Sequence, residues 1–217
     1  MTTKRTALLV VLLSAAALAF SLWAFPNLPE RVPSHWNMQG QVDGTMPRAT
    51  MVYLLPGTML ILGLLLLYIP TIDPLRKNVE RFRSAFNWFI AGMTLFFLFL
   101  HVLTVLAGLG VAFNMTVVLI PVVAVVMVGI GFVLDRTQPN WFLGIRTPWT
   151  LSSPTVWEKT HRLGGLLFKI GGVVLLSGLA FSPQTGFLLI MGLILAITLA
   201  TVVYSYFAYR SEQAQNP

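Results

Sequence analysis

The polar side chains best suited to chemistry lie in one connecting segment, residues 140–161, which reads NWFLGIRTPWTLSSPTVWEKTH between two apolar runs. Cations and hydroxyl donors near the start of a helix form a binding site for an anionic group, such as a phospholipid phosphate, a nucleotide or an acidic patch on a protein. Including the cation directly after the segment, the candidates for binding a ligand or partner are Asn140, Gly144, Arg146, Thr147, Trp149, Ser152, Ser153, Trp157, Lys159, His161 and Arg162.

Two other interpretations fit this segment. Its three tryptophans suit the headgroup zone of a membrane, where an indole buries its ring and keeps its N–H hydrated, so the segment could serve as an anchor. A serine hydrolase would need Ser152 or Ser153 to reach His161, and no G-x-S-x-G motif supports that geometry. We therefore assign no catalytic residue and expect the chain not to be an enzyme.

The sequence also predicts the local structure of the segment. Its first part, residues 140–150, contains a glycine and a proline and should be irregular, whereas Ser153 followed by Pro154 is typical of a helix start. Two side-chain pairs then lie one turn apart on that helix: Trp157 with His161, and Glu158 with Arg162.

A second polar segment, residues 26–48, carries four prolines and two glycines, which favour extended and turn conformations over helix. A metal site from His35 and two carboxylates is conceivable, but the compact spacing of metal ligands is missing, and closure by internal hydrogen bonds is commoner in such loops. No metal or other cofactor is predicted. The candidate binding residues here are Glu30, His35, Asn37, Asp43 and Arg48.

Polar residues also recur inside an apolar run, at residues 85–108. Asn87, Thr94, His101 and Gly108 are spaced by seven, and Thr104 lies one turn from His101, so they form one helix face that should point into a helix bundle. The histidine either makes an interhelical hydrogen bond or forms a proton or ligand site. In a later run, Gly164, Gly171 and Gly178, beside Gly165 and Gly172, should let another helix approach closely.

The composition shows what must position these residues. The 217-residue chain is 56% hydrophobic, with a mean hydropathy of +0.79, which is more apolar surface than one soluble core of this size can hide. It contains no cysteine, so a disulfide framework and a cysteine nucleophile are excluded. The net charge of +7 comes from short basic runs beside apolar segments, a pattern typical of membrane topology signals.

Six apolar spans of membrane-crossing length are predicted, at residues 6–25, 51–69, 85–108, 116–134, 164–181 and 187–209. Two cations, Arg31 and Arg48, fall in the connections on one side. Eleven fall on the other: Lys4, Arg5, Arg76, Lys77, Arg81, Arg83, Arg136, Arg146, Lys159, Arg162 and Arg210. The positive-inside rule then predicts an all-α integral membrane protein, a bundle of six transmembrane helices with both termini cytoplasmic.

Two sequence features at the ends of the spans refine this topology. The first span could be a cleaved signal peptide, but its apolar run is longer than usual and no A-x-A site ends it, so we expect a helix. Lys169 lies inside the fifth span and should extend toward the cytoplasmic interface. The expected domains are residues 1–84, a two-helix unit with an extracytoplasmic Pro-rich loop (26–50), and residues 85–217, a four-helix unit with a cytoplasmic motif loop (135–163).

Both polar segments resemble parts of a known family. The run N-W-F-L-G-I-R-T-P-W-T-L-S-S, with W-E-K-T-H-R after it, is similar to the signature of the SdpI family. The run L-P-E-R-V-P-S-H-W-N-x-x-G-x-x-D-G resembles the small domain of unknown function that precedes it in such proteins. The two motifs occur in the expected order, and the six-span layout fits, so the resemblance covers nearly the whole chain.

The resemblance implies a bacterial inner-membrane immunity and signal-transduction protein that protects against a secreted antimicrobial peptide and holds a transcriptional repressor at the membrane. The implied partners are membrane lipids, a toxin peptide outside and a repressor protein inside, without direct binding of nucleic acid. The residues leave an alternative open: a small transporter, or a membrane enzyme acting on a lipid or envelope precursor.

Overall fold

The computed structural model describes residues 1–215, and in that part of the chain six helices are long and apolar enough to cross a membrane. This confirms the all-α membrane fold expected from the sequence. The six are α1 (Thr3–Ala24), α2 (Arg48–Ile72), α4 (Arg83–Gly108), α5 (Met115–Leu134), α7 (Pro154–Leu175) and α8 (Pro183–Gln215). The shorter elements are η1 (Phe25–Asn27), β1 (Arg31–Trp36), β2 (Val42–Pro47), α3 (Arg76–Arg81), α6 (Pro148–Ser152) and η2 (Leu176–Ala180).

The helices bury small residues and expose large apolar ones, as expected where lipid rather than water surrounds them. In α1 the buried positions are spaced by three or four residues and are mostly small: Thr6, Val10, Ser14, Ala17, Ser21 and Ala24. Large apolar side chains lie outside, such as Val125 at 73% exposure and Ile61 at 67%. Burying these side chains in hydrocarbon therefore drives insertion, and close contact between small residues drives helix packing.

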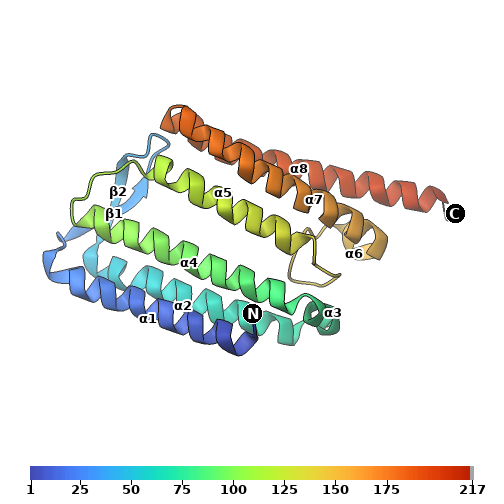
Figure 1. The fold of residues 1–217 in the computed structure, drawn as a ribbon, viewed down its shortest axis with the longest axis horizontal. Helices are drawn as coiled ribbons and strands as arrows, with labels where there is room; N and C mark the ends of the chain where they lie inside the picture. Colours follow the sequence, from blue (N-terminus) through green and yellow to red (C-terminus); the bar gives the residue numbers. More distant parts are fainter. Residues whose placement is uncertain (216–217) are drawn as a thin grey trace.

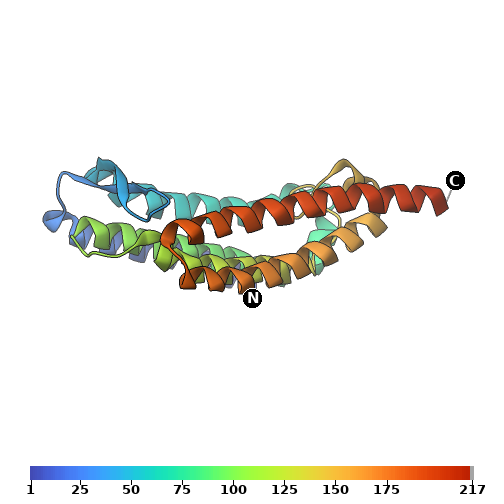
Figure 2. The same ribbon diagram turned by 90° about the horizontal axis from the view of Figure 1, so that it is seen from above.

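The six long helices pack as two groups of three (Figure 1). Helices α1, α2 and α4 form one group, and α5, α7 and α8 form the other, with α4 beside α5 where the groups meet. Viewed from above, the molecule is long and shallow (Figure 2). The sequence motifs placed a domain boundary at residue 84, before α4, whereas α4 packs with α1 and α2. The division into domains stays a prediction.

Glycines let α5 and α7 approach closely, as the sevenfold glycine pattern predicted. A Cβ on Gly165 would lie 2.9 Å from the Gly131 carbonyl oxygen, and one on Gly172 would lie 2.6 Å from the Ala124 carbonyl oxygen. Even alanine at either position would therefore push the two helix backbones apart.

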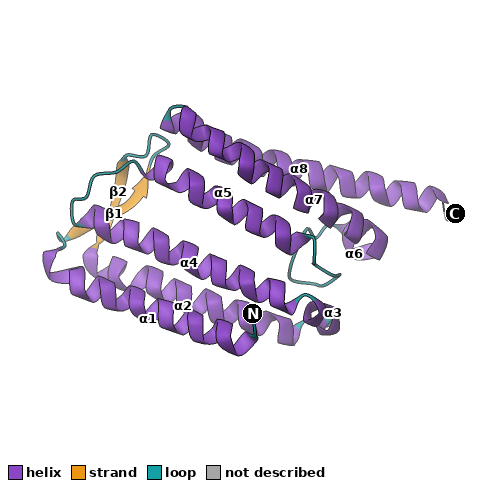
Figure 3. Ribbon diagram, viewed as in Figure 1, coloured by secondary structure: helices purple, strands orange, loops and turns teal. Residues whose placement is uncertain are grey.

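A strand pair covers one end of the bundle, and short helices and loops cover the other (Figure 3). At the end called here the hairpin end, β1 and β2 pair antiparallel, with Val32 opposite Met46, in the segment predicted to be extended. Val32 is fully buried and packs on the helix ends beside Leu28 and Val105. At the opposite end, called the loop end, lie α3, α6 and residues 135–147, together with the start of α1 and the end of α8. The N-terminus and the last described turn of α8 thus lie at the loop end.

Candidate functional site

The segment between α5 and α7 is held in shape by one buried amide. Asn140 is fully buried, and its Oδ1 accepts hydrogen bonds from the N–H groups of Phe142, at 3.0 Å, and Leu143, at 2.7 Å. Its Nδ2 donates to the carbonyl oxygens of Gln138, at 2.8 Å, and Leu143, at 3.0 Å. Asn140 therefore shapes the loop from within, and its side chain is occupied by backbone partners.

Two residues that sequence reasoning missed, one before α3 and one within it, fasten the loop to this part of the chain. The carboxylate of Asp73 accepts hydrogen bonds from the N–H groups of Leu75, at 2.7 Å, and Trp141, at 3.0 Å. Asn78 donates from Nδ2 to the Pro139 carbonyl oxygen at 2.9 Å. An aspartate directly before a proline at the end of an apolar run is a turn signal, but its partner 68 residues away is not visible in the sequence.

His161 and Trp157 form the floor beneath the loop. Their rings stack with centroids 4.1 Å apart, at the one-turn spacing predicted from the sequence. The Ile145 N–H donates to His161 Nε2 at 2.9 Å, and His161 Nδ1 donates to the Trp157 carbonyl oxygen at 2.8 Å. The backbone N–H can bond only to a bare ring nitrogen, so the imidazole is neutral.

Trp157 is buried inside the protein and does not keep its N–H hydrated, as the anchor interpretation required. It is 1% exposed, and its indole N–H donates to the Thr137 carbonyl oxygen at 3.0 Å. A buried indole needs such a partner, and the loop supplies it. Of the three tryptophans, Trp141 is exposed and Trp149 is half-buried against Tyr206. The anchor interpretation is therefore wrong for Trp157.

Gly144 allows the loop to close onto this floor. Its φ is +104°, a conformation that L side chains rarely adopt, and a Cβ there would lie 2.4 Å from His161 Nε2. The backbone next to Ile145 can therefore reach the histidine only because residue 144 has no side chain.

The part expected to be irregular, residues 140–150, contains the start of a short helix. Pro148 takes the first position of α6, and Thr147 and Thr150 form a reciprocal capping box, with backbone-to-hydroxyl distances of 2.8 and 3.1 Å. The Thr147 hydroxyl also lies 3.0 Å from that of Ser205 on α8. The irregular prediction was wrong here, because proline begins a helix as readily as it ends one.

The second helix start was predicted correctly. Ser153 caps α7, accepting a hydrogen bond from the Val156 N–H at 3.2 Å, and Pro154 follows at the first helical position. The exposed hydroxyl of Ser152 donates to the Pro148 carbonyl oxygen at 2.6 Å. Both serine hydroxyls thus form hydrogen bonds with backbone groups, and neither bonds to His161.

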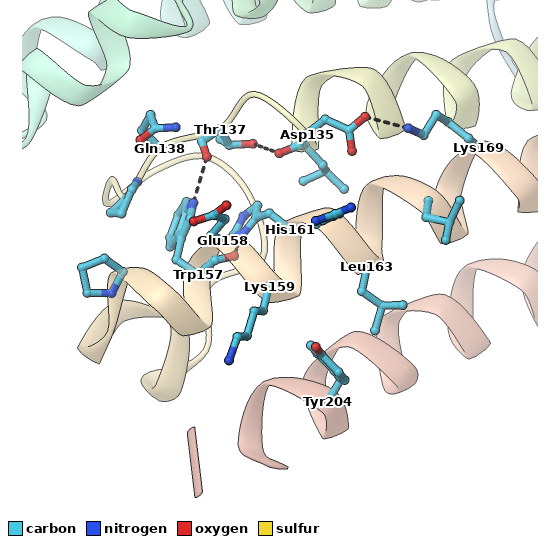
Figure 4. A pocket seen from close by; sticks show the side chains of 15 residues that line it. Asp135, Thr137, Gln138, Trp157, Glu158, Lys159, His161, Leu163, Lys169 and Tyr204 are labelled. Atoms are coloured by element: carbon cyan, nitrogen blue, oxygen red, sulfur yellow. Dashed lines mark hydrogen bonds and ion pairs between the residues drawn. The ribbon is translucent and has the colours of Figure 1, made fainter. Parts of the chain in front are cut away.

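An open pocket of about 930 Å³ lies at the loop end, and two of the exposed cations are among its lining residues. Lys159, His161 and Arg162 line it, together with Glu158 of α7 and Tyr204 of α8 (Figure 4). Within the described residues no ion pair joins Glu158 to Arg162, despite their favourable spacing. Charged side chains thus remain available to a ligand or partner.

One ion pair crosses the side of this pocket nearest the membrane. Lys169 Nζ lies 2.6 Å from the carboxylate of Asp135, which follows the last turn of α5 (Figure 4). Lys169 does extend toward the loop end, as predicted, but the pairing with Asp135 was missed. The two side chains are about a third exposed, at 29% and 31%.

Arg146 lies outside that pocket's lining. Its side chain is exposed, and one guanidinium N–H group donates to the Trp141 carbonyl oxygen. The structure therefore separates the candidates of this loop into three sets. Asn140, Gly144, Thr147 and Ser153 shape the backbone; Trp157, Lys159, His161 and Arg162 line the pocket; Arg146, Trp149 and Ser152 lie outside it.

At the hairpin end, the structure brings two of the five candidates together. His35 Nδ1 lies 2.5 Å from the Asp43 carboxylate, and the histidine side chain is 72% exposed. Asn37 shapes the turn by accepting hydrogen bonds from the N–H groups of Gln39 and Gln41, both at 3.0 Å. Glu30 does not join His35 and Asp43, and no group of three possible metal ligands occurs in the described residues.

The last candidate of this loop, Arg48, is a structural cation. It begins α2, its guanidinium donates to the Leu28 carbonyl oxygen at 2.6 Å, and it lies over the Phe25 ring at 4.6 Å. These contacts tie the end of α1 to the start of α2, and they leave His35 and Asp43 as the most accessible polar pair.

The polar stripe of α4 faces the bundle, as predicted. All five of its members are buried: Asn87, Thr94, His101, Thr104 and Gly108. His101 Nε2 lies 2.6 Å from the Ser21 hydroxyl and 3.0 Å from the Ala17 carbonyl oxygen of α1. Asn87 donates to the Met1 carbonyl oxygen at 3.0 Å. The stripe thus joins α4 to α1, and its histidine contacts α1 rather than the hairpin.

The fold and its two polar ends define a six-helix integral membrane protein with a compact hairpin at one end and a structured, charged loop at the other. The model of the SdpI/YfhL protein family matches residues 136–205, and that of a domain of unknown function (DUF1648) matches residues 12–60. Immunity protein SdpI of Bacillus subtilis (strain 168) is 27% identical over 194 residues, which cover 87% of each chain. No solved structure matches this chain.

The chain therefore resembles the SdpI family, with a region similar to that domain of unknown function before it. It is a multi-pass protein of the bacterial inner membrane. The two matched regions contain the two polar ends: residues 12–60 include the hairpin, and residues 136–205 include the charged loop.

Proposed function

We propose that this chain is a membrane immunity protein, which protects the cell that makes it from a secreted antimicrobial peptide. The observation that carries the proposal is its likeness to Immunity protein SdpI over 87% of both chains. That likeness extends through both polar ends of the molecule, where a ligand outside and a partner inside could each bind.

On the predicted topology, the hairpin faces outward and meets the peptide. It is a small but rigid surface: Val32 anchors it in the bundle, and Asn114 donates to the Gln39 carbonyl oxygen at 2.6 Å. Its exposed side includes the pair His35 and Asp43 beside the apolar side chains of Met38 and Val42. Such a mixture of apolar and charged groups suits an amphipathic peptide at a membrane surface.

The loop end faces the cytoplasm and binds a regulator, on the same topology. Arg146, Lys159 and Arg162 are all exposed there, on a backbone fixed by Asn140 and Gly144. A rigid surface with exposed cations fits an acidic patch on a protein, because little conformational entropy is lost when it binds. Sequestration of a transcriptional repressor is the specific form that the family resemblance implies.

Complementation tests this proposal. A Bacillus subtilis strain lacking its own SdpI is made to express this chain and is then exposed to the sporulation-delaying peptide. Survival is expected with the wild-type chain and should be lost with the double variant His35→Ala/Asp43→Ala. Gln39→Ala, another exposed position of the hairpin, is the matched control and should protect.

Membrane levels of each protein are measured by immunoblotting, so that a failure to insert is recognised. A wild-type chain that inserts normally but leaves the cells as sensitive as the parent strain would contradict the immunity role. Protection by the double variant would instead show that the hairpin pair does not meet the peptide.

The pocket at the loop end favours a second candidate, a small transporter or a membrane enzyme acting on an anionic envelope precursor. Its volume of about 930 Å³ and its lining cations would suit a phosphate group. However, Glu158 and Asp135 also line it, and these carboxylates oppose an anion. Two results together would support this candidate. The wild-type chain would give no protection, and it would bind undecaprenyl phosphate, with that binding lost in Lys159→Gln/Arg162→Gln.

A further inference from the structure

A second pocket at the loop end differs from the first in its charge. It occupies about 540 Å³ between the end of α3, the first turns of α4 and the last turns of α5. Arg81 and Arg136 line it, and no carboxylate does. In the described residues neither arginine forms an ion pair, and the neighbouring carboxylate of Asp135 is paired with Lys169.

The polar groups of this pocket have hydrogen-bond donors to spare. Arg136 uses one guanidinium N–H group to bond the Phe132 carbonyl oxygen at 2.8 Å, which holds the side chain at the end of α5. The Ser84 hydroxyl accepts a hydrogen bond from the Met1 amino group at 2.8 Å, so its own O–H can donate. Two cations and a hydroxyl donor are the groups that bind a phosphate.

The remaining walls are apolar and lead into the membrane. Trp88 and Phe132 are 63% and 52% exposed, and they stand on α4 and α5 in the part of each helix nearest the loop end. Tryptophan at this depth is typical of the membrane interface. The pocket is therefore a groove that is cationic at its mouth and apolar where it meets lipid.

Gly129 gives this groove its depth and has no role in protein packing. A Cβ there would meet nothing within 4 Å, whereas one on Gly131, on the same helix, would lie 2.6 Å from the Gly165 carbonyl oxygen. An unpacked glycine inside a helix weakens it. It lies seven residues from Arg136, a helix rise of about 10 Å, which is the length of several methylene groups.

We propose that the groove formed by Arg81, Ser84, Trp88, Gly129, Phe132 and Arg136 binds one anionic phospholipid. The phosphate lies between the two arginines, and an acyl chain follows the space above Gly129. The site is distinct from the charged pocket of the loop and does not depend on the immunity role.

Native mass spectrometry of the full chain in detergent tests this site, with phosphatidylglycerol and phosphatidylcholine as probes. Each arginine near the headgroup should contribute about a fivefold preference for the anionic lipid, or about 25-fold for both. Arg81→Gln/Arg136→Gln should remove that preference. The control Arg76→Gln/Lys77→Gln removes the same charge from exposed positions of α3 outside the groove. This control should keep the preference for the anionic lipid.

A second pair of variants tests the acyl chain. Gly129→Leu fills the groove and should weaken binding of both lipids, whereas Gly192→Leu, at another exposed helical glycine with open space around it, should not. Free glycerol phosphate should not displace the lipid. The proposal would be overturned if the two charge variants lost the preference for the anionic lipid equally. Unchanged lipid binding by Gly129→Leu, or displacement of the lipid by free glycerol phosphate, would also overturn it.

Discussion

Gly144 offers the sharpest test of how the charged loop is built. Replacing it with alanine introduces two separate faults. A side chain at φ +104° strains the backbone by about 1–3 kcal/mol. The new Cβ also meets His161 Nε2 and displaces the hydrogen bond that Ile145 donates to it.

The second fault leaves the Ile145 N–H without its acceptor. Loss of a partner by a buried donor costs about 1–3 kcal/mol, and the lower part of that range applies because this bond is only partly buried. Gly144→Ala should therefore lower the free energy of unfolding by about 2–5 kcal/mol.

Gly110 is the matched control, because it separates the two faults. It also has a positive φ, +87°, but a Cβ there would meet nothing within 4 Å. Gly110→Ala should thus show backbone strain alone, about 1–3 kcal/mol. The measurement is unfolding of both variants in mixed detergent micelles with increasing denaturant, followed by tryptophan fluorescence.

A double-mutant cycle then assigns the remaining difference to His161. In a His161→Ala background the clash disappears, so Gly144→Ala should cost no more than Gly110→Ala does. Equal costs for the two glycine variants in the wild-type background, or a Gly144→Ala cost that His161→Ala leaves unchanged, would refute this description of the loop.

Three further outcomes are expected. Single cysteines at Gln41 and Gln138, both exposed, should be labelled from opposite sides of intact cells, and labelling of both from outside would contradict the six-span topology. His101→Gln should lower the free energy of unfolding by about 1 kcal/mol, because the bond from His101 to Ser21 joins α4 to α1. Protection should be unchanged. Unchanged stability would argue against that bond. Lys169→Met should lower the free energy of unfolding by at most about 1 kcal/mol, because the pair with Asp135 is about a third exposed. Adding Asp135→Asn should lower it little further. A much larger loss of stability would show that the pair does more than join two helices.

The sequence predicted those features that depend on local pattern. Hydropathy located the spans, and sevenfold spacing predicted both the buried face that holds His101 and the glycine contacts of α7. The helix start at Ser153 was also predicted, because capping needs only neighbouring residues. Each of these signals lies within a single helix or its first turn.

The contacts that the sequence did not predict join residues far apart. Asp73 holds the loop from 68 residues away, and Ser21 bonds to His101 across 80 residues. Trp157 resembled an interfacial anchor because the carbonyl that binds its indole N–H belongs to the preceding loop, 20 residues earlier. Side-chain type alone therefore did not distinguish residues that shape the loop, such as Asn140, from those that face a ligand.

On the proposed function, the loop end is a recognition surface whose exposed cations bind a partner needed for protection. Arg146 is the residue to test, because a planar guanidinium can bond a carboxylate or phosphate through two parallel N–H groups, and lysine cannot. Arg76→Lys is the control: it makes the same change at an exposed position of α3, outside both pockets and outside the proposed surface.

The most direct measurement is survival of the complemented strain under the peptide, with membrane levels of each variant measured alongside. Arg146→Lys should abolish protection at a normal membrane level, whereas Arg76→Lys should protect as the wild-type chain does. Loss of protection is also expected from His161→Ala, because the loop would lose its floor. Full protection by the Arg146→Lys protein would contradict the claim and leave the loop as a structural cap on the bundle.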